Sequence, residues 1–338
     1  MTALHSKIRS LVSGYQGPYA FLKYNSPVKL WNLLLTEFQR VFRRTCLVSY
    51  PYKLIVDTTN ICNLKCLYCP TGKGEIGRQK GFMTFDHFKS IVDELGRYTY
   101  IVDLFNWGEP LLNKDICKMV AYAESNNICT NIHTNLNCEV TGGDAENIIQ
   151  SGLSFLSVSL DGANQQVYST YRRKGDLEKA LHNARILIEL REKSKKKKPF
   201  ITWQFLVFPH NRHHVERAHR LSREMGFDSF KVLAGVMPGG LGNITKAQKD
   251  EIKKLKDIEK NKCDWLWTTA TFHWDQAVAP CCLQFKKDDD FGSAKDERFK
   301  TIWNNETFMY ARSLIGRKGA THGQKVICNN CFKVMSPD

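Results

Sequence analysis

The chain contains the stretch Asn60-Ile-Cys-Asn-Leu-Lys-Cys-Leu-Tyr-Cys-Pro70, which directly follows a short apolar run. Its three cysteines, Cys62, Cys66 and Cys69, have the spacing C-x3-C-x2-C. Three thiolates on one loop can hold three irons of a cubane and leave the fourth iron open, whereas a closed structural site needs four protein ligands. The stretch therefore predicts an iron–sulfur site at which a further ligand can bind to iron.

Two other interpretations of this stretch are a partial zinc site and a chance cluster of cysteines. A zinc site requires a fourth ligand nearby. The residues that follow, Thr71 to Gly81, include neither Cys nor His. We therefore favour the iron–sulfur interpretation.

Length and cysteine content limit the class of protein. A chain of 338 residues is long enough for one large domain with a small appendage, or for two domains. Its 12 cysteines are too few for a disulfide scaffold and cluster at metal-like spacings, which favours a reducing compartment. The start of the chain shows no signal-peptide pattern, and the apolar runs are far shorter than the ~20 residues that span a bilayer. We expect a cytoplasmic protein.

The basic charge is concentrated in two segments. Of the total of +15, residues 1–53 contribute +7 and residues 191–198 contribute +5. We expect the lysine run at 195–198 to be a solvated loop, on the barrel face opposite the active site. Because the excess is local and no aromatic-basic RNA-binding module is visible, we expect no nucleic-acid partner.

Strand-like and helix-like segments alternate from residue 53 to about residue 236. We expect strands at 53–57, 100–106, 129–134, 155–160, 200–208 and 229–233. We expect helices at 84–95, 115–125, 144–150, 177–192 and 213–225. Because these repeats fall short of the eight that close a full barrel, the sequence predicts an α/β fold with a partial (βα)6 TIM-like barrel.

The pattern changes after the glycine-rich stretch Pro238-Gly-Gly-Leu-Gly242. We expect four parts: a basic amphipathic extension at 1–49, the barrel at 50–237, a linker with a charged helix (246–260) at 238–262, and a small cysteine-rich domain at 263–338.

Residues 28–44 predict a basic amphipathic helix with Arg40, Arg43 and Arg44 near its end. Its apolar face is formed by Trp31, Leu34, Leu35, Phe38 and Phe42. Such a helix either caps the open barrel or contacts a membrane surface, and we expect it to cap the barrel.

The cysteine loop, with Tyr68 before its last cysteine, resembles the signature of the radical S-adenosylmethionine (radical SAM) enzymes. In that family the open iron chelates the amino and carboxylate groups of SAM, and one electron cleaves SAM to a 5′-deoxyadenosyl radical. The resemblance implies a partial barrel, a [4Fe-4S] cluster on Cys62, Cys66 and Cys69, and a flavodoxin- or ferredoxin-type electron donor.

Four later segments, each at the expected end of a strand, extend this resemblance. Gly108-Glu109-Pro110 is similar to the family's GGEP motif, whose glutamate takes the SAM amino group, although Trp107 stands where the family has its first glycine. The other three segments resemble a Thr-Asn pair over the cofactor, an S-x-D-G segment near its methionyl and ribose groups, and an arginine for its carboxylate. The SAM-contacting residues that the resemblance implies are Tyr68, Gly108, Glu109, Pro110, Thr134, Asn135, Ser159, Asp161 and Arg172.

A second constellation consists of Cys263, Cys281, Cys328 and Cys331. Four thiolates make a closed site, and a terminal C-x2-C that completes a site begun far upstream is typical of zinc and iron–sulfur centres. This region resembles the SPASM or Twitch auxiliary-cluster domain, and its five cysteines imply the shorter Twitch form with one auxiliary [4Fe-4S] cluster. A structural zinc ion on the same four cysteines is the alternative. In the family a proline directly precedes the ligating cysteine, which favours Cys281 over Cys282 as the ligand.

Together the resemblances imply a radical SAM enzyme that abstracts a hydrogen from a carbohydrate-like or other small-molecule substrate. The result is oxidation if the auxiliary cluster accepts an electron, and epimerisation if a thiol returns a hydrogen. Two alternatives remain, a maturase that modifies a ribosomally made peptide and a non-catalytic iron–sulfur or RNA-binding protein. Since only about 50 residues precede the first expected strand, no extra peptide-binding domain is evident, and we expect a small molecule.

Overall fold

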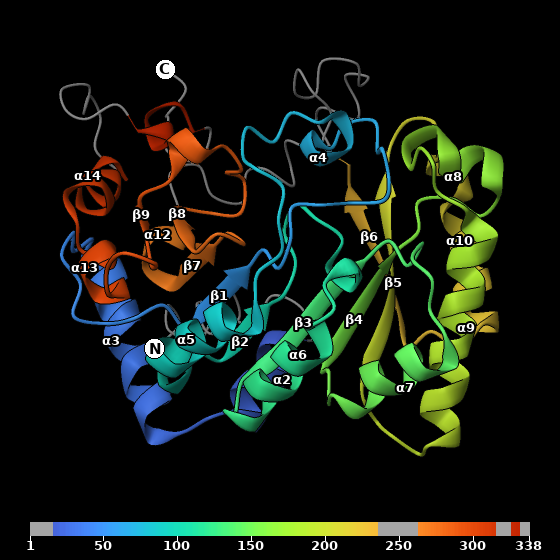
Figure 1. Cartoon of the computed structure of the whole chain (residues 1–338), viewed down its shortest axis with the longest axis horizontal. Helices are drawn as coiled ribbons and strands as arrows, with labels where there is room; N and C mark the ends of the chain where they lie inside the picture. Colours follow the sequence, from blue (N-terminus) through green and yellow to red (C-terminus); the bar gives the residue numbers. More distant parts are fainter. Residues whose placement is uncertain (1–15, 236–262, 316–325, 332–338) are drawn as a thin grey trace.

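The computed structural model describes residues 16–235, 263–315 and 326–331. Its strands form a nine-stranded sheet with the order β6-β5-β4-β3-β2-β1-β7-β8-β9 (Figure 1). The strands are β1 (Lys53–Val56), β2 (Ile101–Asp103), β3 (Cys129–Thr134), β4 (Phe155–Ser159), β5 (Phe200–Val207), β6 (Ser229–Ala234), β7 (Thr269–Phe272), β8 (Ala277–Ala279) and β9 (Gly292–Ser293).

The α-helices are α2 (Gln16–Lys23), α3 (Pro27–Val41), α4 (Pro70–Lys73), α5 (Phe85–Leu95), α6 (Ile116–Ser125), α7 (Gly142–Gln150), α8 (Gln165–Tyr171), α9 (Leu177–Lys193), α10 (Val215–Glu224), α12 (Trp265–Thr268), α13 (Phe299–Trp303) and α14 (Glu306–Leu314). Short 3₁₀ turns are η1 (Gly96–Tyr98), η2 (Pro110–Leu112), η3 (Arg212–His214), η4 (Lys287–Asp289) and η5 (Ile327–Asn330). Within the described ranges, none of the helices has both the length and the apolar character needed to cross a bilayer.

The strands β1 to β6 run parallel in sequential order, which confirms the predicted α/β partial barrel. Local sequence explains the helix boundaries: Thr84 accepts a hydrogen bond from His87 N and so caps α5. The strand β2 is shorter than expected, because the chain leaves the sheet after Asp103. The helix α8 was not predicted.

The C-terminal segment is built onto the open edge of the barrel. Strand β7 pairs parallel with β1, with Thr269 opposite Lys53, and β8 and β9 continue the sheet as antiparallel strands. One hydrophobic core includes Leu54 of β1 together with Phe272 and Trp303 of the C-terminal segment. The two cysteine-bearing parts of the chain therefore share a sheet and a core.

The N-terminal helices pack in a way that the sequence did not predict. Helix α2 covers the amino-terminal end of the barrel strands, where Ala20 and Tyr24 cluster with Cys129 and Phe155. The prediction that the apolar face of the next helix, α3, caps the barrel is wrong, since Trp31 on that face is 70% exposed. The opposite, polar side of α3 is buried instead, because its side chains hydrogen-bond to the backbone of the domain.

The lysine run is only partly the solvated loop that we expected. Residues 195–197 are exposed. In contrast, Lys198 Nζ donates to Glu124 Oε2 over 2.8 Å and to Ser154 Oγ over 2.9 Å, and so joins α6 to the start of β4. The expected linker and the helix at 246–260 lie outside the described residues.

A buried ion-pair network joins the segment before α5 to the C-terminal strands. The Arg78 side chain is 1% exposed and contacts Asp275 over 2.6 Å and Asp290 over 2.5 Å. Burial raises the pKa of Asp290, and Arg78 opposes that rise. Removing the arginine would leave two partly buried carboxylates without their cation. Uncompensated buried charge strongly lowers the free energy of unfolding.

We predict that Arg78→Met lowers the free energy of unfolding by about 3 kcal/mol. Denaturant unfolding under anaerobic conditions measures this change. The matched control is Lys73→Met, because Lys73 pairs with Glu75 on the surface, where both side chains are more than 40% exposed, and should cost under about 1 kcal/mol. Equal losses for the two variants would contradict the account.

Candidate active site

The three-cysteine loop lies at the carboxyl ends of the barrel strands, where barrel active sites are built. Figure 1 shows α4, which directly follows the loop, at the end of the sheet toward which the parallel strands run. Two backbone hydrogen bonds attach the loop to the end of α8: Lys65 N donates to Arg173 O over 2.9 Å, and Leu67 N donates to Tyr171 O over 3.0 Å. The loop is therefore held by β1 at its start and by α8 in its middle.

An apolar cluster surrounds the thiols. Cys66 packs with Leu64, Tyr171 and Phe208, and the other two loop cysteines contact the same cluster. The ring of Tyr68 lies 5.9 Å from that of Tyr171 and 5.7 Å from that of Phe208, measured between centroids. The sequence-predicted Tyr68 is thus part of the wall around the loop.

The three thiols lie close enough to influence one another. Burial raises the pKa of Cys62 to about 12, the Leu64 amide opposes this, and Glu109, Cys66 and Cys69 raise the pKa further. Burial also raises the pKa of Cys66, and Arg172 is the main group that opposes it. The raised pKa values favour the protonated thiols of Cys62 and Cys66, so binding of iron there must displace protons.

The turn after β2 is pressed against the start of the cysteine loop. A Cβ atom on Gly108 would lie 1.9 Å from Thr59 O, so only glycine fits there. The next amide, Glu109 N, donates to Ile61 O over 2.8 Å. Pro110 is buried and begins η2. The predicted Gly-Glu-Pro segment therefore fixes the loop by direct backbone contact.

The Glu109 carboxylate links the ends of β2 and β3. It accepts hydrogen bonds from Thr134 Oγ1 over 2.6 Å, from Asn135 N over 2.7 Å and from Leu111 N over 3.2 Å. Complete burial raises the pKa of Glu109, and these three hydrogen bonds oppose the rise. Asn135 Nδ2 in turn lies 3.6 Å from Cys62 Sγ. Glu109 and Asn135 thus connect the third strand to the first thiol.

Asp161 and Arg172 form a buried ion pair on the other side of the loop. Arg172 Nε donates to Asp161 Oδ2 over 2.6 Å, and Leu206 N donates to Asp161 Oδ1 over 2.7 Å. Burial raises the pKa of Asp161, and Arg172 opposes that rise. Arg172 is also near enough to Cys66 to affect its thiol. Ser159, two residues before Asp161, is buried at the end of β4.

The second cysteine constellation also comes together in space. Burial raises the pKa of Cys281 to about 12, with smaller increases from Cys282, Cys263 and Cys331. Burial raises the pKa of Cys328 as well, and the thiols of Cys263, Cys281 and Cys331 add to that rise. Cys282 lies beside Lys53 of β1, whose pKa it helps to raise. The structure thus places Cys281 near the other three cysteines, and Cys282 lies near both Cys281 and the barrel lysine.

Three thiols are available at the first loop and four in the C-terminal segment, which are the ligand numbers of an open and a closed iron–sulfur cubane. The apolar surroundings and the Leu64 amide, which donates to Cys62 Sγ over 3.4 Å, suit an iron–sulfur cluster at the first loop.

Trp107 links the two cysteine sets. Its indole Nε1 donates to Gln284 O over 3.0 Å, and its ring lies 5.1 Å from that of Phe285. Its backbone amide donates to Asp57 Oδ1 at the end of β1 over 3.1 Å. The sequence marked Trp107 only as a departure from the family pattern, because a contact across almost 180 residues has no local signal.

Polar side chains line the inner face of the sheet, which we define as the side opposite the helices that follow the strands. Lys53 Nζ pairs with Asp103 over 2.7 Å, and Asn131 Nδ2 donates to Asp103 Oδ1 over 2.9 Å. The His133 ring stacks on Phe105 with 3.8 Å between centroids. Burial lowers the pKa of His133 to about 4, so it is neutral at physiological pH.

Gln204 of β5 is a further polar residue on this face. Its neighbours Trp203 and Phe205 pack among the helices, so alternation along the strand turns Gln204 to the opposite side. The side chain is buried, and within the described part of the chain its Oε1 atom has no hydrogen-bond partner. Register places it opposite Lys231 of β6. The sequence analysis missed Gln204, although a glutamine between buried aromatic residues was a usable signal.

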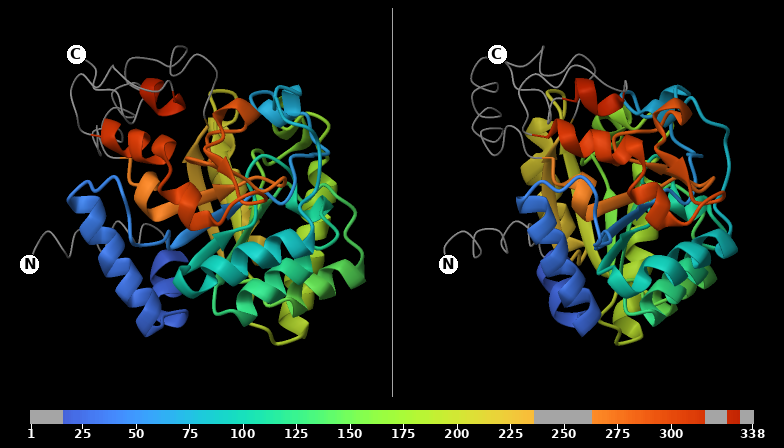
Figure 2. Two further views of the ribbon diagram at one scale, coloured as in Figure 1. Left: turned by 60° about the vertical axis from the view of Figure 1, so that its left-hand side comes forward. Right: turned by 90° about the vertical axis from the view of Figure 1, so that its left-hand side faces the viewer.

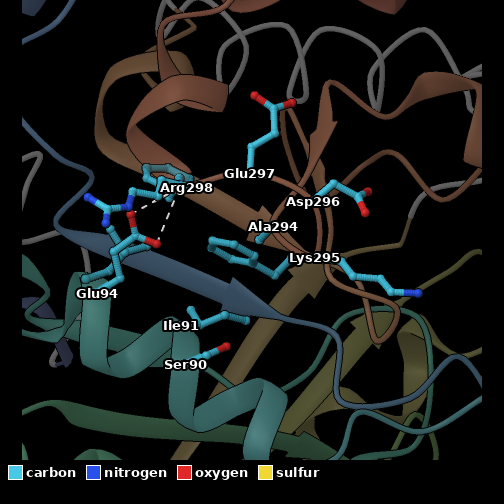
Figure 3. Close-up of a pocket in the computed structure, with 11 residues that line it drawn as sticks. Ser90, Ile91, Glu94, Ala294, Lys295, Asp296, Glu297 and Arg298 are labelled. Atoms are coloured by element: carbon cyan, nitrogen blue, oxygen red, sulfur yellow. Dashed lines mark hydrogen bonds between the residues drawn. The ribbon is translucent and has the colours of Figure 1, made fainter.

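A surface pocket lies elsewhere, between α5 and the segment from Ala294 to Phe299 (Figure 3). There Glu94 accepts hydrogen bonds from Phe299 N over 3.1 Å and 3.3 Å. No cysteine lines this pocket. It is a junction between the barrel and the C-terminal segment, and we assign it no role in the chemistry.

Comparison with known proteins identifies both parts of the chain. The model of the radical SAM superfamily matches residues 56–221, and the model of the SPASM iron–sulfur cluster-binding domain matches residues 263–332. A probable GTP 3′,8-cyclase from Methanocaldococcus jannaschii is 28% identical over 137 residues, which are 40% of this chain and 45% of that protein. The mycofactocin maturase MftC of Mycolicibacterium smegmatis is 30% identical over 131 residues, which are 39% of this chain and 33% of that protein.

Comparison with solved structures agrees with the matches to the family models. The crystal structure of Streptococcus suis SuiB bound to S-adenosylmethionine superposes with a TM-score of 0.63 at 15% identity, over 84% of this chain and 73% of that one. The chain spans less than half of the length of the two curated relatives above. The chain therefore belongs to the radical SAM superfamily, with SAM and [4Fe-4S] clusters as its cofactors, and it carries a C-terminal SPASM iron–sulfur domain.

Proposed function

We propose that this enzyme removes a hydrogen atom from a polar small molecule bound against the inner face of the sheet, with oxidation or epimerisation as the net reaction. The observation that carries the proposal is the position of the cysteine loop at the carboxyl ends of strands whose inner face is polar. When bound, the first cluster and SAM supply a 5′-deoxyadenosyl radical.

The residues around the loop have distinct proposed roles. Gly108 and Pro110 fix the position of the backbone beside the loop. Glu109 accepts a hydrogen bond from the backbone of Asn135, and so positions the Asn135 side chain next to Cys62. Asp161 orients Arg172, whose fixed charge suits a carboxylate of the cofactor. Because Glu109 and Asp161 already accept hydrogen bonds within the chain, we propose that they position their neighbours as well as meeting SAM.

We propose that Cys263, Cys281, Cys328 and Cys331 hold one auxiliary cluster, the arrangement of the Twitch form. The mutual proximity of these thiols supports this ligand set. The cluster supplies a second redox centre on the same sheet. We propose a flavodoxin- or ferredoxin-type protein as the electron donor of the enzyme.

The inner face favours a polar substrate. It presents Lys53 paired with Asp103, and Lys231 near the neutral imidazole of His133. The buried and unpartnered Oε1 of Gln204 is costly to leave unsatisfied, so a ligand that donates a hydrogen bond to it would relieve that cost. A hydroxyl-rich or acidic molecule such as a carbohydrate derivative fits these groups.

Modification of a peptide is the second candidate. It is favoured by the mycofactocin maturase, to which this chain is 30% identical over the aligned region. Peptide and sugar both donate hydrogen bonds, so Gln204 suits either one. Assays with a candidate precursor peptide and with sugar derivatives would separate the two candidate functions. The measurement is whether SAM is consumed together with the formation of a modified product.

The cysteine loop can be tested by removing its three thiols. Changing Cys62, Cys66 and Cys69 together to Ala should remove about half of the iron, since one of two equal cubanes loses all of its protein ligands. Cleavage of SAM to 5′-deoxyadenosine under dithionite should be abolished. Retained cleavage in the triple variant would refute the assignment.

The next prediction separates the adjacent cysteines of the auxiliary domain. Cys281→Ser should lose the auxiliary cluster, which iron analysis and electron paramagnetic resonance of the reduced protein would detect, while SAM cleavage under dithionite persists. Cys282→Ser is the matched control and should retain the iron of both sites. The reverse result would assign the ligand to Cys282.

Gln204 allows a test that does not require the substrate. We predict that Gln204→Met leaves the free energy of unfolding unchanged or raises it by about 1 kcal/mol, because the change removes an unsatisfied buried oxygen. The control is Gln39→Met, since Gln39 is equally buried at 6% exposure but accepts a hydrogen bond from Ser49 N over 3.0 Å. This control should lose about 1–2 kcal/mol. A larger loss for Gln204→Met than for Gln39→Met would show that Gln204 serves stability rather than a ligand.

A further inference from the structure

Helix α3 is attached to the protein through its polar side. Asn32 exchanges two hydrogen bonds with Tyr50, each 2.9 Å long. Gln39 accepts a hydrogen bond from Ser49 N, and Arg40 pairs with Asp264 over 2.7 Å. Because these bonds are directional and largely buried, they fix which side of the helix faces the domain.

The side of α3 that points away from the domain is apolar. Its outer stripe consists of Trp31, Leu34, Phe38, Val41 and Phe42, which are 70%, 54%, 54%, 49% and 62% exposed. Nine of the twelve large apolar side chains that are exposed in the described chain lie between Leu22 and Val48. Such a concentration is unusual for a surface that meets only water.

The stripe lies on the outside of the molecule and is bordered by positive charge. Figures 1 and 2 show α3 along the periphery, away from α9 and α10. Exposed Lys23 lies before the stripe, and exposed Arg43 and Arg44 follow it. In the sequence, residues 1–53 contain eight Lys and Arg against the single acidic residue Glu37. The segment thus combines exposed apolar side chains with the exposed cations Lys23, Arg43 and Arg44.

We propose that the outer stripe of α3 binds the surface of an anionic lipid bilayer, with Trp31 and Phe38 as apolar anchors and the flanking cations on the headgroups. An amphipathic helix with aromatic and aliphatic anchors and basic flanks is the arrangement that lies in a membrane interface. Tryptophan suits the headgroup boundary, because its ring is apolar and its N–H is polar. Complementarity between the basic flanks and anionic lipid favours this occupant over a second copy of the chain, which is equally basic.

The test uses the full chain, purified anaerobically, with vesicles of phosphatidylcholine containing phosphatidylglycerol and with vesicles of phosphatidylcholine alone. The wild-type protein should co-sediment with the anionic vesicles, and added salt should weaken this binding. The double variant Trp31→Ser with Phe38→Ser should reduce the partition coefficient by about 10- to 100-fold, because two large side chains no longer leave water.

The control variants are Val232→Ser and Leu283→Ser, whose side chains are each 47% exposed elsewhere on the protein. They should bind vesicles as the wild type does. Lys23→Gln with Arg44→Gln should remove most of the preference for anionic over neutral vesicles. None of these substitutions should lower the melting temperature noticeably, since the side chains are exposed.

Three results would overturn the proposal. The first is no binding of the wild type to anionic vesicles. The second is a wild-type dimer that the double variant converts to a monomer in light scattering, which would assign the stripe to a second copy. The third is a melting temperature lowered by the double variant as far as by a core substitution, which would mean that the chain itself covers the stripe.

Discussion

Strand β1 is hydrogen-bonded to β2 on one side and to β7 on the other, and the arrangement of both cysteine sets depends on this double pairing. The end of β1 leads into the loop with Cys62, and the strand after β7 leads into Cys281. Because the sheet is continuous, the two sets are held at a fixed relation by backbone hydrogen bonds. The buried Arg78 pairs and the indole of Trp107 reinforce the same junction.

Charge is balanced around the cysteine loop by buried groups rather than by solvent. Glu109 on one side and Arg172 with Asp161 on the other are buried and hydrogen-bonded within the chain. In such a low-dielectric setting each charge acts strongly on its neighbours, and water can do little to screen it. The pKa shifts of Cys62 and Cys66 follow from this environment.

The sequence predicted the parts of the structure that have a local signal. The period of the apolar residues located the strands, and β3 has the bounds that were expected, Cys129–Thr134. The cysteine spacings singled out both sets. Contacts between distant segments were not predictable in this way: nothing near Arg78 or Trp107 shows that they meet residues roughly 200 positions away. The amphipathic pattern of α3 showed which face is apolar, but hydrogen bonds to Tyr50 and Ser49 decide which face is buried.

The central claim is that one sheet carries two separate iron–sulfur sites, of which only the first meets SAM. The direct measurement is iron and sulfide analysis of the anaerobically reconstituted wild-type protein, combined with electron paramagnetic resonance of its reduced form with and without SAM. The account predicts about eight irons and eight sulfides per chain, from two cubanes of four each, and two reduced signals of which one changes when SAM is added. A content of about four irons accompanied by zinc, or two signals that both ignore SAM, would contradict it.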